Sequence, residues 1–350
     1  MSIEISRRKF LSSITTLAAA GTAAVVISEF NGQQLFKSGK QNPKVEIVPN
    51  TNTPTPTHTP VYTDIGGEPT AIPTPEKPIL SKEMLNLQET LKSEIDAYHG
   101  QTAIAITDVK TNETIEVNGN RPQLPGCVAN LACALTVVSE LSKNKALFTK
   151  ENIEEDLTIM VRHSNPSVGL RVVEAIGGGS IKEGVNKINQ SMKEWGMYKS
   201  FYDHPPAYDT TYSANDNSNQ MAATEINSVL TKVANSQLFD KKDFDWNVYA
   251  LWVMSKNKPG LNFMLPGQIP ENDAEVFHKV GWVPGQPNTI NDAGVVSALD
   301  HRFLYTITFM YQNYETAVEE DALFYGPGLF GSNLSKITYD MFSQKYPLPQ

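Results

Sequence analysis

Cysteine is scarce in this chain, and only Cys127 and Cys133 occur in 350 residues. Both lie in the apolar stretch LPGCVANLACAL (124–135), which predicts a buried helix. Six residues of helix rise about 9 Å, whereas a disulfide needs Cα atoms within about 7 Å. The two thiols are therefore not expected to pair, and they are too few for a zinc site of the usual spacing. Nothing in the sequence indicates a metal or an organic cofactor.

Excess positive charge is also lacking. The chain has 29 Lys and Arg against 38 Asp and Glu, a net charge of −9 and a pI near 5.3. Phosphate contacts need clustered basic residues, so this balance argues against a nucleic-acid partner. A hydrophobic content of 40% suits a globular core. Oligomeric state stays open.

The N-terminal segment predicts export. Residues 1–30 read MSIEISRRKFLSSITTLAAAGTAAVVISEF, a basic start followed by an apolar run. The core SRRKFL is similar to a bacterial twin-arginine signal, and an ordinary secretory signal is the alternative. The run is near the length needed to span a bilayer, so it could also remain as an anchor. We expect an extracytoplasmic protein whose only membrane contact is this segment.

Residues 31–79 predict a linker. Its main part, 49–78, contains eight prolines and eight threonines. Such a composition cannot build a core and favours an extended, polyproline-rich spacer.

A domain is expected over 80–350. Ser81 predicts a helix cap, followed by an apolar stripe of helical spacing. TAIAITDV and TIEVN (102–109 and 114–118) predict two strands around a turn, and three more are expected within 275–313. The middle, about 126–255, is helical in pattern, and KITYDMFSQKY (336–346) predicts a closing helix. The predicted fold class is α+β, an antiparallel sheet with terminal helices and an inserted helical lobe.

Several motifs together resemble a known family. In chain order they are AIAITDVKTNETIEVN, QLPGCVANL, RHSNPSVGLRVVEAIGGG, LPGQIPENDAEVFHKVGWVPG and NDAGVV. This series resembles class A β-lactamases and related penicillin-recognising serine hydrolases over about 80–348. The resemblance implies a five-stranded antiparallel sheet and acyl-transfer chemistry, with a serine nucleophile, a nearby lysine, an S-D-N loop and a K-T-G strand.

The resemblance also assigns positions to site residues. Cys127 falls at the nucleophile, Asn130 at the first lysine, Ser164 at the relay serine and Lys279 at the strand lysine. The substrate-binding positions implied by the resemblance are Asn165, Pro166, Val280, Gly281 and Trp282. The oxyanion donors would be the backbone N–H groups of Cys127 and Trp282.

Four expected functional elements are altered or missing. An amide at Asn130 cannot accept a proton as an amine can, and positioned acid–base catalysis contributes about 10²–10⁴-fold. Val280 lacks the threonine hydroxyl, and Pro166 lacks a side-chain amide. No E-x-x-L-N pattern occurs between Gly179 and Asn215, and the equivalent stretch SFYDHPPAYDTTYSANDN (200–217) offers Asp203 and Asp209 without placing either at the position of the glutamate.

Two functions follow, and both remain open at the level of sequence. The favoured hypothesis is a catalytically degenerate domain that binds a small-molecule or peptidoglycan-type ligand or a partner. The alternative is an active acyl hydrolase or transferase, of the β-lactamase or D-alanyl-D-alanine peptidase type, with Cys127 as nucleophile.

Several side chains carry two readings. Cys127 is a nucleophile or a small core residue, whereas Cys133 is expected in the core. Ser164 is a relay hydroxyl or, somewhat favoured, a helix cap. Asn130 is expected to bond to Ser164 or Lys279. A base could come from either of two histidines, but the strand period points one of them away from Lys279. These histidines are His163 and His278, and Trp282 is expected at the cleft edge.

Overall fold

The computed structural model describes residues 79–143, 150–205, 218–240, 244–255, 263–283, 287–315 and 320–348. The predicted export signal and nearly all of the predicted linker lie outside these residues, as does Asp209. In the part that is described, no helix is long and apolar enough to cross a membrane. The elements are α2 (Lys82–Ala97), β1 (Gln101–Asp108), β2 (Glu113–Val117), the 3₁₀ helix η1 (Gly126–Ala129), α3 (Asn130–Ser142), α4 (Lys150–His163), α5 (Pro166–Ile176), α6 (Ile181–Glu194), α7 (Ala223–Ala234), α8 (Trp246–Ser255), β3 (Ala274–Val283), β4 (Asn288–Ala298), β5 (Leu304–Asn313), α9 (Glu320–Leu323), the π-helical η3 (Phe324–Gly328) and α10 (Leu329–Lys345).

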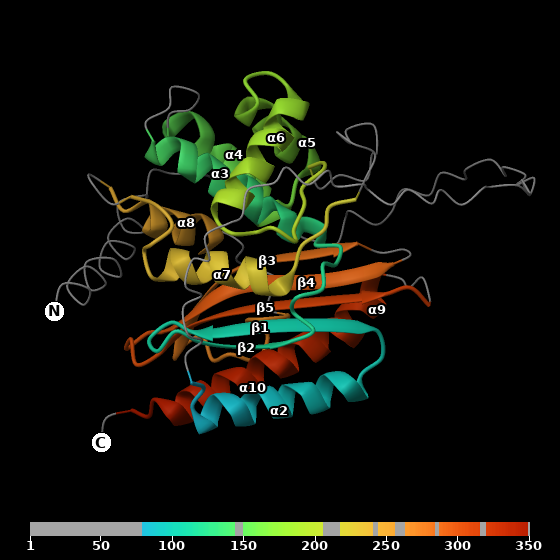
Figure 1. The fold of residues 1–350 in the computed structure, drawn as a ribbon, viewed down its shortest axis with the longest axis vertical. Coiled ribbons are helices and arrows are strands. Elements are labelled where there is room, and N and C mark those ends of the chain that lie inside the picture. Colours follow the sequence, from blue (N-terminus) through green and yellow to red (C-terminus); the bar gives the residue numbers. More distant parts are fainter. Residues whose placement is uncertain are drawn as a thin grey trace, which may run out of the picture. The chain divides into compact units, whose positions relative to one another are not determined.

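The sheet confirms the predicted fold class. Five strands run in the order β2-β1-β5-β4-β3, and all neighbouring pairs are antiparallel. Strands from both ends of the domain meet where β1 pairs with β5, and β3 forms one edge (Figure 1). The helical lobe is inserted between β2 and β3, as expected from the pattern of 126–255.

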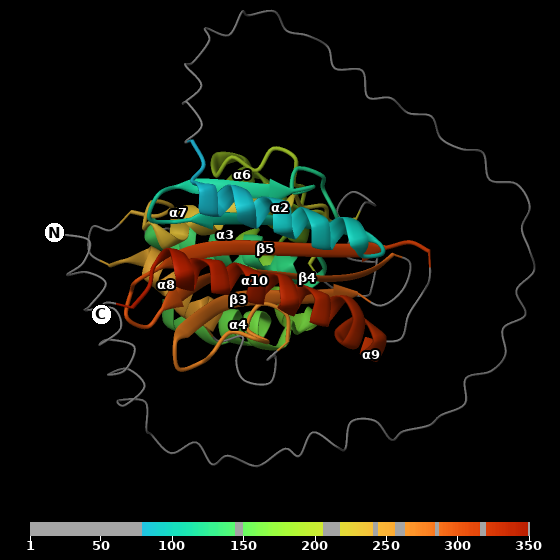
Figure 2. The same cartoon turned by 90° about the horizontal axis from the view of Figure 1, so that it is seen from below.

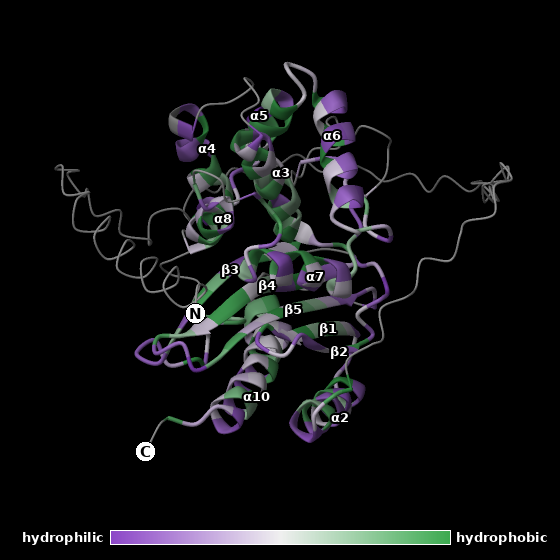
Figure 3. Ribbon diagram, turned by 60° about the vertical axis from the view of Figure 1, so that its left-hand side comes forward, coloured by the Kyte–Doolittle hydropathy of each residue, from purple (hydrophilic) through white to green (hydrophobic). Residues whose placement is uncertain are grey.

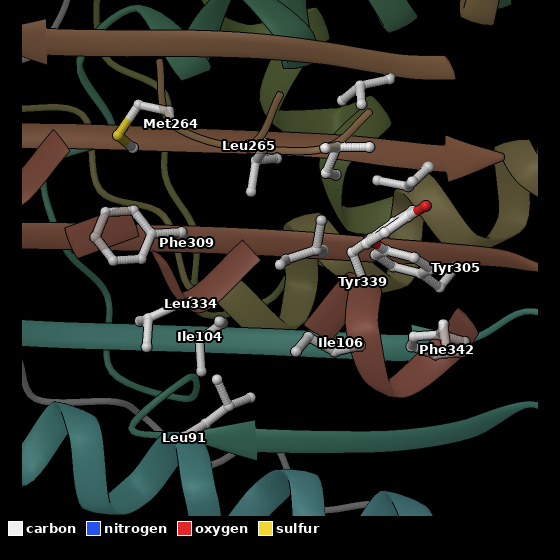
Figure 4. Packing of buried hydrophobic residues seen from close by; sticks show 14 of the residues in the cluster. Leu91, Ile104, Ile106, Met264, Leu265, Tyr305, Phe309, Leu334, Tyr339 and Phe342 are labelled. Carbon is white, nitrogen blue, oxygen red and sulfur yellow. The ribbon is translucent and has the colours of Figure 1, made fainter. Parts of the chain in front are cut away.

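Helices α2 and α10 cover one face of the sheet (Figure 2). Ser81 caps α2 by accepting a hydrogen bond from the Met84 N–H, as the sequence predicted. The apolar stripe of α2 then faces the sheet, because residues three and four apart share one side of a helix. Figure 4 shows this core, in which the Tyr305 and Phe342 rings stack with centroids 4.3 Å apart. Each fully buried side chain of this size contributes about 1.5–3 kcal/mol.

A charge cluster joins the ends of this layer. The Lys345 ammonium near the end of α10 lies 2.9 Å from Asp108 and 2.7 Å from Glu113. The Ser81 N–H donates to the Glu113 carboxylate, so the same cluster holds the start of α2. The cluster therefore ties α2, α10 and the β1–β2 turn together.

The other face of the sheet carries α7 and the helical lobe. Helix α3 runs through the middle of the lobe and is buried from Asn130 to Leu141. In Figure 3 it is largely green, whereas α4 and α6, which lie farther from the middle of the lobe, carry hydrophilic faces. A helix that is apolar on all sides must be enclosed by its neighbours. The turn η1, which leads into this buried helix, packs against β3 of the sheet.

Candidate functional site

Cys127 lies in η1, the 3₁₀ turn that leads directly into α3. Its side chain is partly exposed, and it is a free thiol. Cys133 is free and fully buried, and burial raises the pKa of its thiol far above the ordinary value. The two cysteines are thus unpaired, as their spacing predicted, and only Cys127 is open to reagents.

Two glycines let strand β3 touch the backbone at Cys127. A Cβ on Gly281 would lie 2.4 Å from the Cys127 amide nitrogen and 2.5 Å from that of Val128. Gly126 has φ +52°, and a Cβ there would lie 3.2 Å from the Trp282 amide nitrogen. The amide nitrogens of Cys127 and Trp282, which were predicted as oxyanion donors, therefore both lie at this glycine-to-glycine contact.

The segment before Cys127 is anchored by the sheet. The Asn291 side chain, fully buried on β4, donates to the Leu124 carbonyl at 2.9 Å and accepts from the Tyr311 N–H at 3.0 Å. Gln312 on β5 accepts from the Leu124 N–H at 3.3 Å. Asn291 was not singled out from the sequence, although it begins the NDAGVV motif.

Lys279 is fully buried and hydrogen-bonded to Ser164. Its Nζ donates to Ser164 Oγ at 2.7 Å and to the Val280 carbonyl. Burial lowers the pKa of Lys279, while the nearby Cys127 and Asp292 act in the opposite direction. The charge of Lys279 is therefore coupled electrostatically to the Cys127 thiol.

Ser164 does not cap the helix that follows, so the favoured cap reading is wrong. The cap is Asn165, whose side chain accepts from the Val168 N–H at 3.1 Å, with Pro166 in the first turn of α5. Ser164 has φ +50°, a conformation that is uncommon outside glycine. This backbone directs the Ser164 hydroxyl to Lys279, as the alternative role of a proton-relay hydroxyl would require. The exposed Asn165 and Pro166 begin α5 beside it.

Asn130 does not make the hydrogen bond that was expected with Ser164 or Lys279. It is 2% exposed, and its Nδ2 donates to the Met160 carbonyl of α4 at 3.4 Å. The amide therefore joins α3 to α4 inside the lobe. The reason is shape: the short amide does not reach out of the lobe as a lysine would.

Val280 and Trp282 differ from their predicted roles as substrate contacts. The Val280 side chain is fully buried in the core between the sheet and α2–α10. The Trp282 ring packs edge-on against Phe324, with centroids 5.3 Å apart, and is partly buried against the same core. Both side chains point away from Lys279 because side chains alternate along a strand.

His278 lies on the face opposite Lys279, as expected from the strand period. It is buried, and its Nδ1 lies 2.8 Å from Asp292. Asp292 also accepts from the Leu265 N–H at 3.2 Å. His163 is exposed at the end of α4, and its pKa is lowered by partial burial and by Arg162.

The segment 200–205 reaches α5 at Pro205, which would lie 4.0 Å from a Cβ on Gly169. Tyr202 is fully buried, its hydroxyl has no hydrogen-bond partner within the described residues, and its pKa is raised by burial and by Cys133 and Cys127. Asp203 is also fully buried, and its N–H donates to Asn219 at 2.6 Å. Tyr202 was missed from the sequence because no motif marks it. Over the described ranges, no group of three or more His, Cys, Asp or Glu is placed to hold a metal ion.

Comparisons with known proteins agree with this geometry. Residues 182–324 match the model of the "Beta-lactamase enzyme family". A search of curated protein sequences found no match.

Solved structures share the fold. A β-lactamase from Chitinophaga pinensis has a TM-score of 0.61 and 17% identity, covering 73% of this chain and 98% of its own. A class A β-lactamase from Bacteroides cellulosilyticus has a TM-score of 0.61 and 17% identity, covering 76% and 100%. A PBP-A variant, solved as an acyl-enzyme complex with penicillin G, has a TM-score of 0.58 and 14% identity, covering 75% and 97%. The comparisons confirm the resemblance to penicillin-recognising serine hydrolases. At identities of 14–17%, the solved structures show a shared fold and no shared activity.

Proposed function

We propose that this chain binds an anionic ligand that carries an acyl group, and that it does not hydrolyse this ligand. The fold of class A β-lactamases and the match to the β-lactamase family model support the proposal. The ligand is a small molecule or a peptidoglycan-type fragment. It binds where β3 meets the turn that carries Cys127. The export pattern of residues 1–30 supports an extracytoplasmic location for this binding.

The observation that carries the proposal is the 2.7 Å hydrogen bond between Lys279 and Ser164. A cation in a low-dielectric interior attracts an anion more strongly than one in water. Ser164 is partly exposed, so its hydroxyl is the end of this pair that a ligand can reach. The two backbone amides at the glycine contact supply further donors for a ligand carbonyl or carboxylate.

The absence of turnover follows from position 130. A hydrolase of this family needs a group that takes and returns protons beside the nucleophile. Asn130 carries an amide, which does not titrate, and that amide is bonded to Met160. The E-x-x-L-N pattern of the deacylating glutamate is also missing from the sequence.

The test uses penicillin G, a carboxylate that is also an acyl donor. Binding is measured by calorimetry with the full chain carrying Cys127→Ala, so that only non-covalent association is observed. We expect Lys279→Met to weaken this binding at least about tenfold, since a hydrogen bond to a charged group contributes about 1.5–3 kcal/mol. Lys92→Met is the matched control, because Lys92 is exposed on α2, where it pairs with Asp96.

Hydrolysis is tested separately with a chromogenic cephalosporin and the unsubstituted chain. We expect no steady-state release of chromophore. Steady hydrolysis that disappears in Cys127→Ala would refute the proposal and establish the alternative, an acyl hydrolase with a cysteine nucleophile. Equal binding of penicillin G by the Lys279→Met and Lys92→Met variants would also refute it.

A further inference from the structure

We infer that Cys127 is a redox-sensitive modification site, and that its oxidation by a peroxide to a sulfenate switches off ligand binding at Lys279. The sulfenate is an anion, and it takes the place of the ligand's carboxylate beside the Lys279 ammonium. The inference adds regulation to the proposed function and rests on it for the location of the ligand. Lys279 is a cation throughout, as that function requires.

The backbone brings the Lys279 ammonium to the cysteine's side of β3. Lys279 and Gly281 are two residues apart on this strand, so their side-chain directions share one face. That face lies against Cys127, because a Cβ on Gly281 would be 2.4 Å from the Cys127 nitrogen. Lys279 also interacts electrostatically with Cys127. A neighbouring cation favours the thiolate, which is the form of cysteine that peroxides oxidise.

The charge of Lys279 is open to an anion on this face. Its hydrogen-bond acceptors in the described part of the chain are the Ser164 hydroxyl and the Val280 carbonyl, and both are uncharged. Asp292 attracts Lys279 at longer range, but this carboxylate is bonded to His278 on the opposite face of the sheet. A buried cation is stabilised by an anion placed beside it. A sulfenate on Cys127 would be such an anion.

The Tyr202 hydroxyl supplies a second group for the sulfenate. Tyr202 is fully buried, and its hydroxyl finds no hydrogen-bond partner among the residues that the structure describes. An unpaired buried hydroxyl is rare in folded proteins and calls for an explanation. The thiol of Cys127 is at best a weak acceptor, whereas a sulfenate oxygen accepts a strong hydrogen bond because it is charged. Oxidation would therefore give this hydroxyl the acceptor that it lacks.

Backbone pairing places Tyr202 near the start of α3. The residue before Tyr202 pairs with segment 220–221, and this segment pairs in turn with Gln123, four residues before Cys127. Tyr202 also interacts electrostatically with Cys133 and Cys127. The hydroxyl and the Lys279 ammonium thus approach the same turn from two different parts of the chain.

The oxidation step balances with hydrogen peroxide as the oxidant. The thiol of Cys127 is partly exposed, so a molecule of this size reaches it. The thiolate sulfur attacks one peroxide oxygen, a sulfur–oxygen bond forms and the oxygen–oxygen bond breaks. Sulfur loses two electrons, and the peroxide gains the same two. The departing hydroxide takes the proton of the new S–OH group and leaves as water, so the product is the sulfenate.

The sulfenate has no thiol within the chain to react with. Cys133 is the other cysteine of the sequence, and it is fully buried one and a half turns farther along. An added small thiol reverses the oxidation in two steps. The first thiol displaces the sulfenate oxygen as water and forms a mixed disulfide, and a second thiol then releases Cys127 in its reduced form.

The sulfenate opposes the ligand because both are anions that use the same cation. Once the Lys279 ammonium is paired with the sulfenate, an incoming carboxylate meets a negative charge instead of an open positive one. Like charges placed side by side in a binding site cost several kcal/mol in general, enough to reduce affinity by tenfold or more. Reduced chain is therefore the binding form.

The first experiment detects the modification in the full chain. Hydrogen peroxide is added together with dimedone, which traps sulfenic acids, and peptide mapping locates the adduct. Dimedone is needed because the ten methionines of the chain also take up oxygen, so added mass alone does not identify the site. We expect one adduct, on Cys127 and absent from Cys133. A native chain without a dimedone adduct on Cys127 overturns the inference.

Variants test the two groups that stabilise the sulfenate. Lys279→Met should slow trapping about tenfold or more, because the cation that favours the thiolate is gone. Lys92→Met, which removes an exposed lysine of α2, should leave the rate unchanged. Equal trapping rates in these two variants overturn the inference.

Tyr202→Phe guards against a Lys279→Met chain that does not fold. The Tyr202 hydroxyl makes no hydrogen bond in the described structure, so its removal should leave the thermal stability of the reduced chain unchanged. We expect the sulfenate, measured by adding dimedone at increasing delays, to persist about tenfold less long. An equally persistent sulfenate in Tyr202→Phe overturns the inference.

Calorimetry with penicillin G tests the switch. The reduced chain should bind penicillin G, the peroxide-treated chain should bind it at least about tenfold more weakly, and dithiothreitol should restore binding. Cys127→Ala, treated in the same way, is the control for methionine oxidation and should bind equally before and after peroxide. Equal affinity of the reduced and oxidised chains overturns the inference, and so does an equal loss in Cys127→Ala. Failure of the reduced chain and of Cys127→Ala to bind penicillin G overturns the proposed function instead.

Discussion

Lys279 and Ser164 lie 115 residues apart in the sequence and 2.7 Å apart in the structure. Lys279 comes from the edge strand of the sheet, and Ser164 comes from the loop between α4 and α5 in the lobe. Their hydrogen bond therefore joins the two parts of the domain at the site. This hydrogen bond is present although Asn130 stands where the resemblance implies a lysine, one turn after the nucleophile position.

Removing the Ser164 hydroxyl tests this bond. In Ser164→Ala the buried Lys279 loses an acceptor, which costs about 1–3 kcal/mol of stability. Ser167→Ala is the matched control, because Ser167 is exposed in the first turn of α5. Chemical denaturation should separate the two variants. Equal stabilities would mean that the bond contributes nothing.

The cap of α5 is tested by Asn165→Ala. The Asn165 side chain accepts from the Val168 N–H, so its loss should cost about 1 kcal/mol. Urea unfolding measures the change, with Ser167→Ala again as the neighbouring exposed control. If Ser164 were the cap after all, Asn165→Ala would match the control.

The glycine contact is tested by Gly281→Ala. A methyl group at this position would lie 2.4 Å from the Cys127 nitrogen, a backbone atom that cannot move aside. We expect a loss of about 3 kcal/mol or more and a damaged ligand site. The control is Gly169→Ala on α5, where a Cβ would meet nothing closer than 3.9 Å and should stabilise the helix by about 0.5–1 kcal/mol. Melting curves followed by circular dichroism measure the stability of both variants, and a Gly281→Ala protein as stable as the unsubstituted chain would contradict the prediction.

Thiol chemistry should distinguish the two cysteines. Iodoacetamide should label Cys127 in the native chain and leave Cys133 unmodified, because Cys133 is fully buried with a raised thiol pKa. Unfolded chain should take two labels, and Cys127→Ala should take none when native. A native chain without label would show that the thiol of Cys127 is inaccessible.

The charge cluster at Lys345 predicts that the free energy of unfolding falls as the pH becomes acidic. Burial would raise the pKa of Glu113, but hydrogen bonds from Lys345, the Ser81 N–H and Thr111 outweigh it and lower the pKa from 4.5 to about 2. A carboxyl with a depressed folded pKa stabilises the fold fully above its unfolded pKa. This contribution is lost as pH falls from about 4.5 to about 2, and it is at most about 3 kcal/mol at ~1.4 kcal/mol per pKa unit.

The measurement is the free energy of unfolding against pH for Glu113→Gln and for Glu89→Gln, an exposed residue of α2. Glu113→Gln should flatten the curve between pH 4.5 and 2, and Glu89→Gln should not. Parallel curves for all three proteins would contradict the assignment.

Much of the fold follows from short-range patterns. The stripe that begins at Met84 reports directly which face of its helix is buried, because a helix has a fixed period. The period of a strand predicts that His278 lies opposite Lys279, as the structure has it. Motif order along the chain then indicated the sheet and the inserted lobe.

What the sequence alone determined is the set of chemical groups: one thiol in the turn before a buried helix, an amide in place of an amine, and a strand lysine without its threonine. Tertiary structure decided how these groups are used. The packing of the lobe against the sheet brings Ser164 to Lys279. Contacts within the lobe bind Asn130 to Met160 and make Asn165 the cap, and the packing of α2 and α10 on the sheet buries Val280. The physical reason is range, since periodicity acts over a few residues, whereas each of these outcomes depends on a backbone conformation or a distance between distant segments.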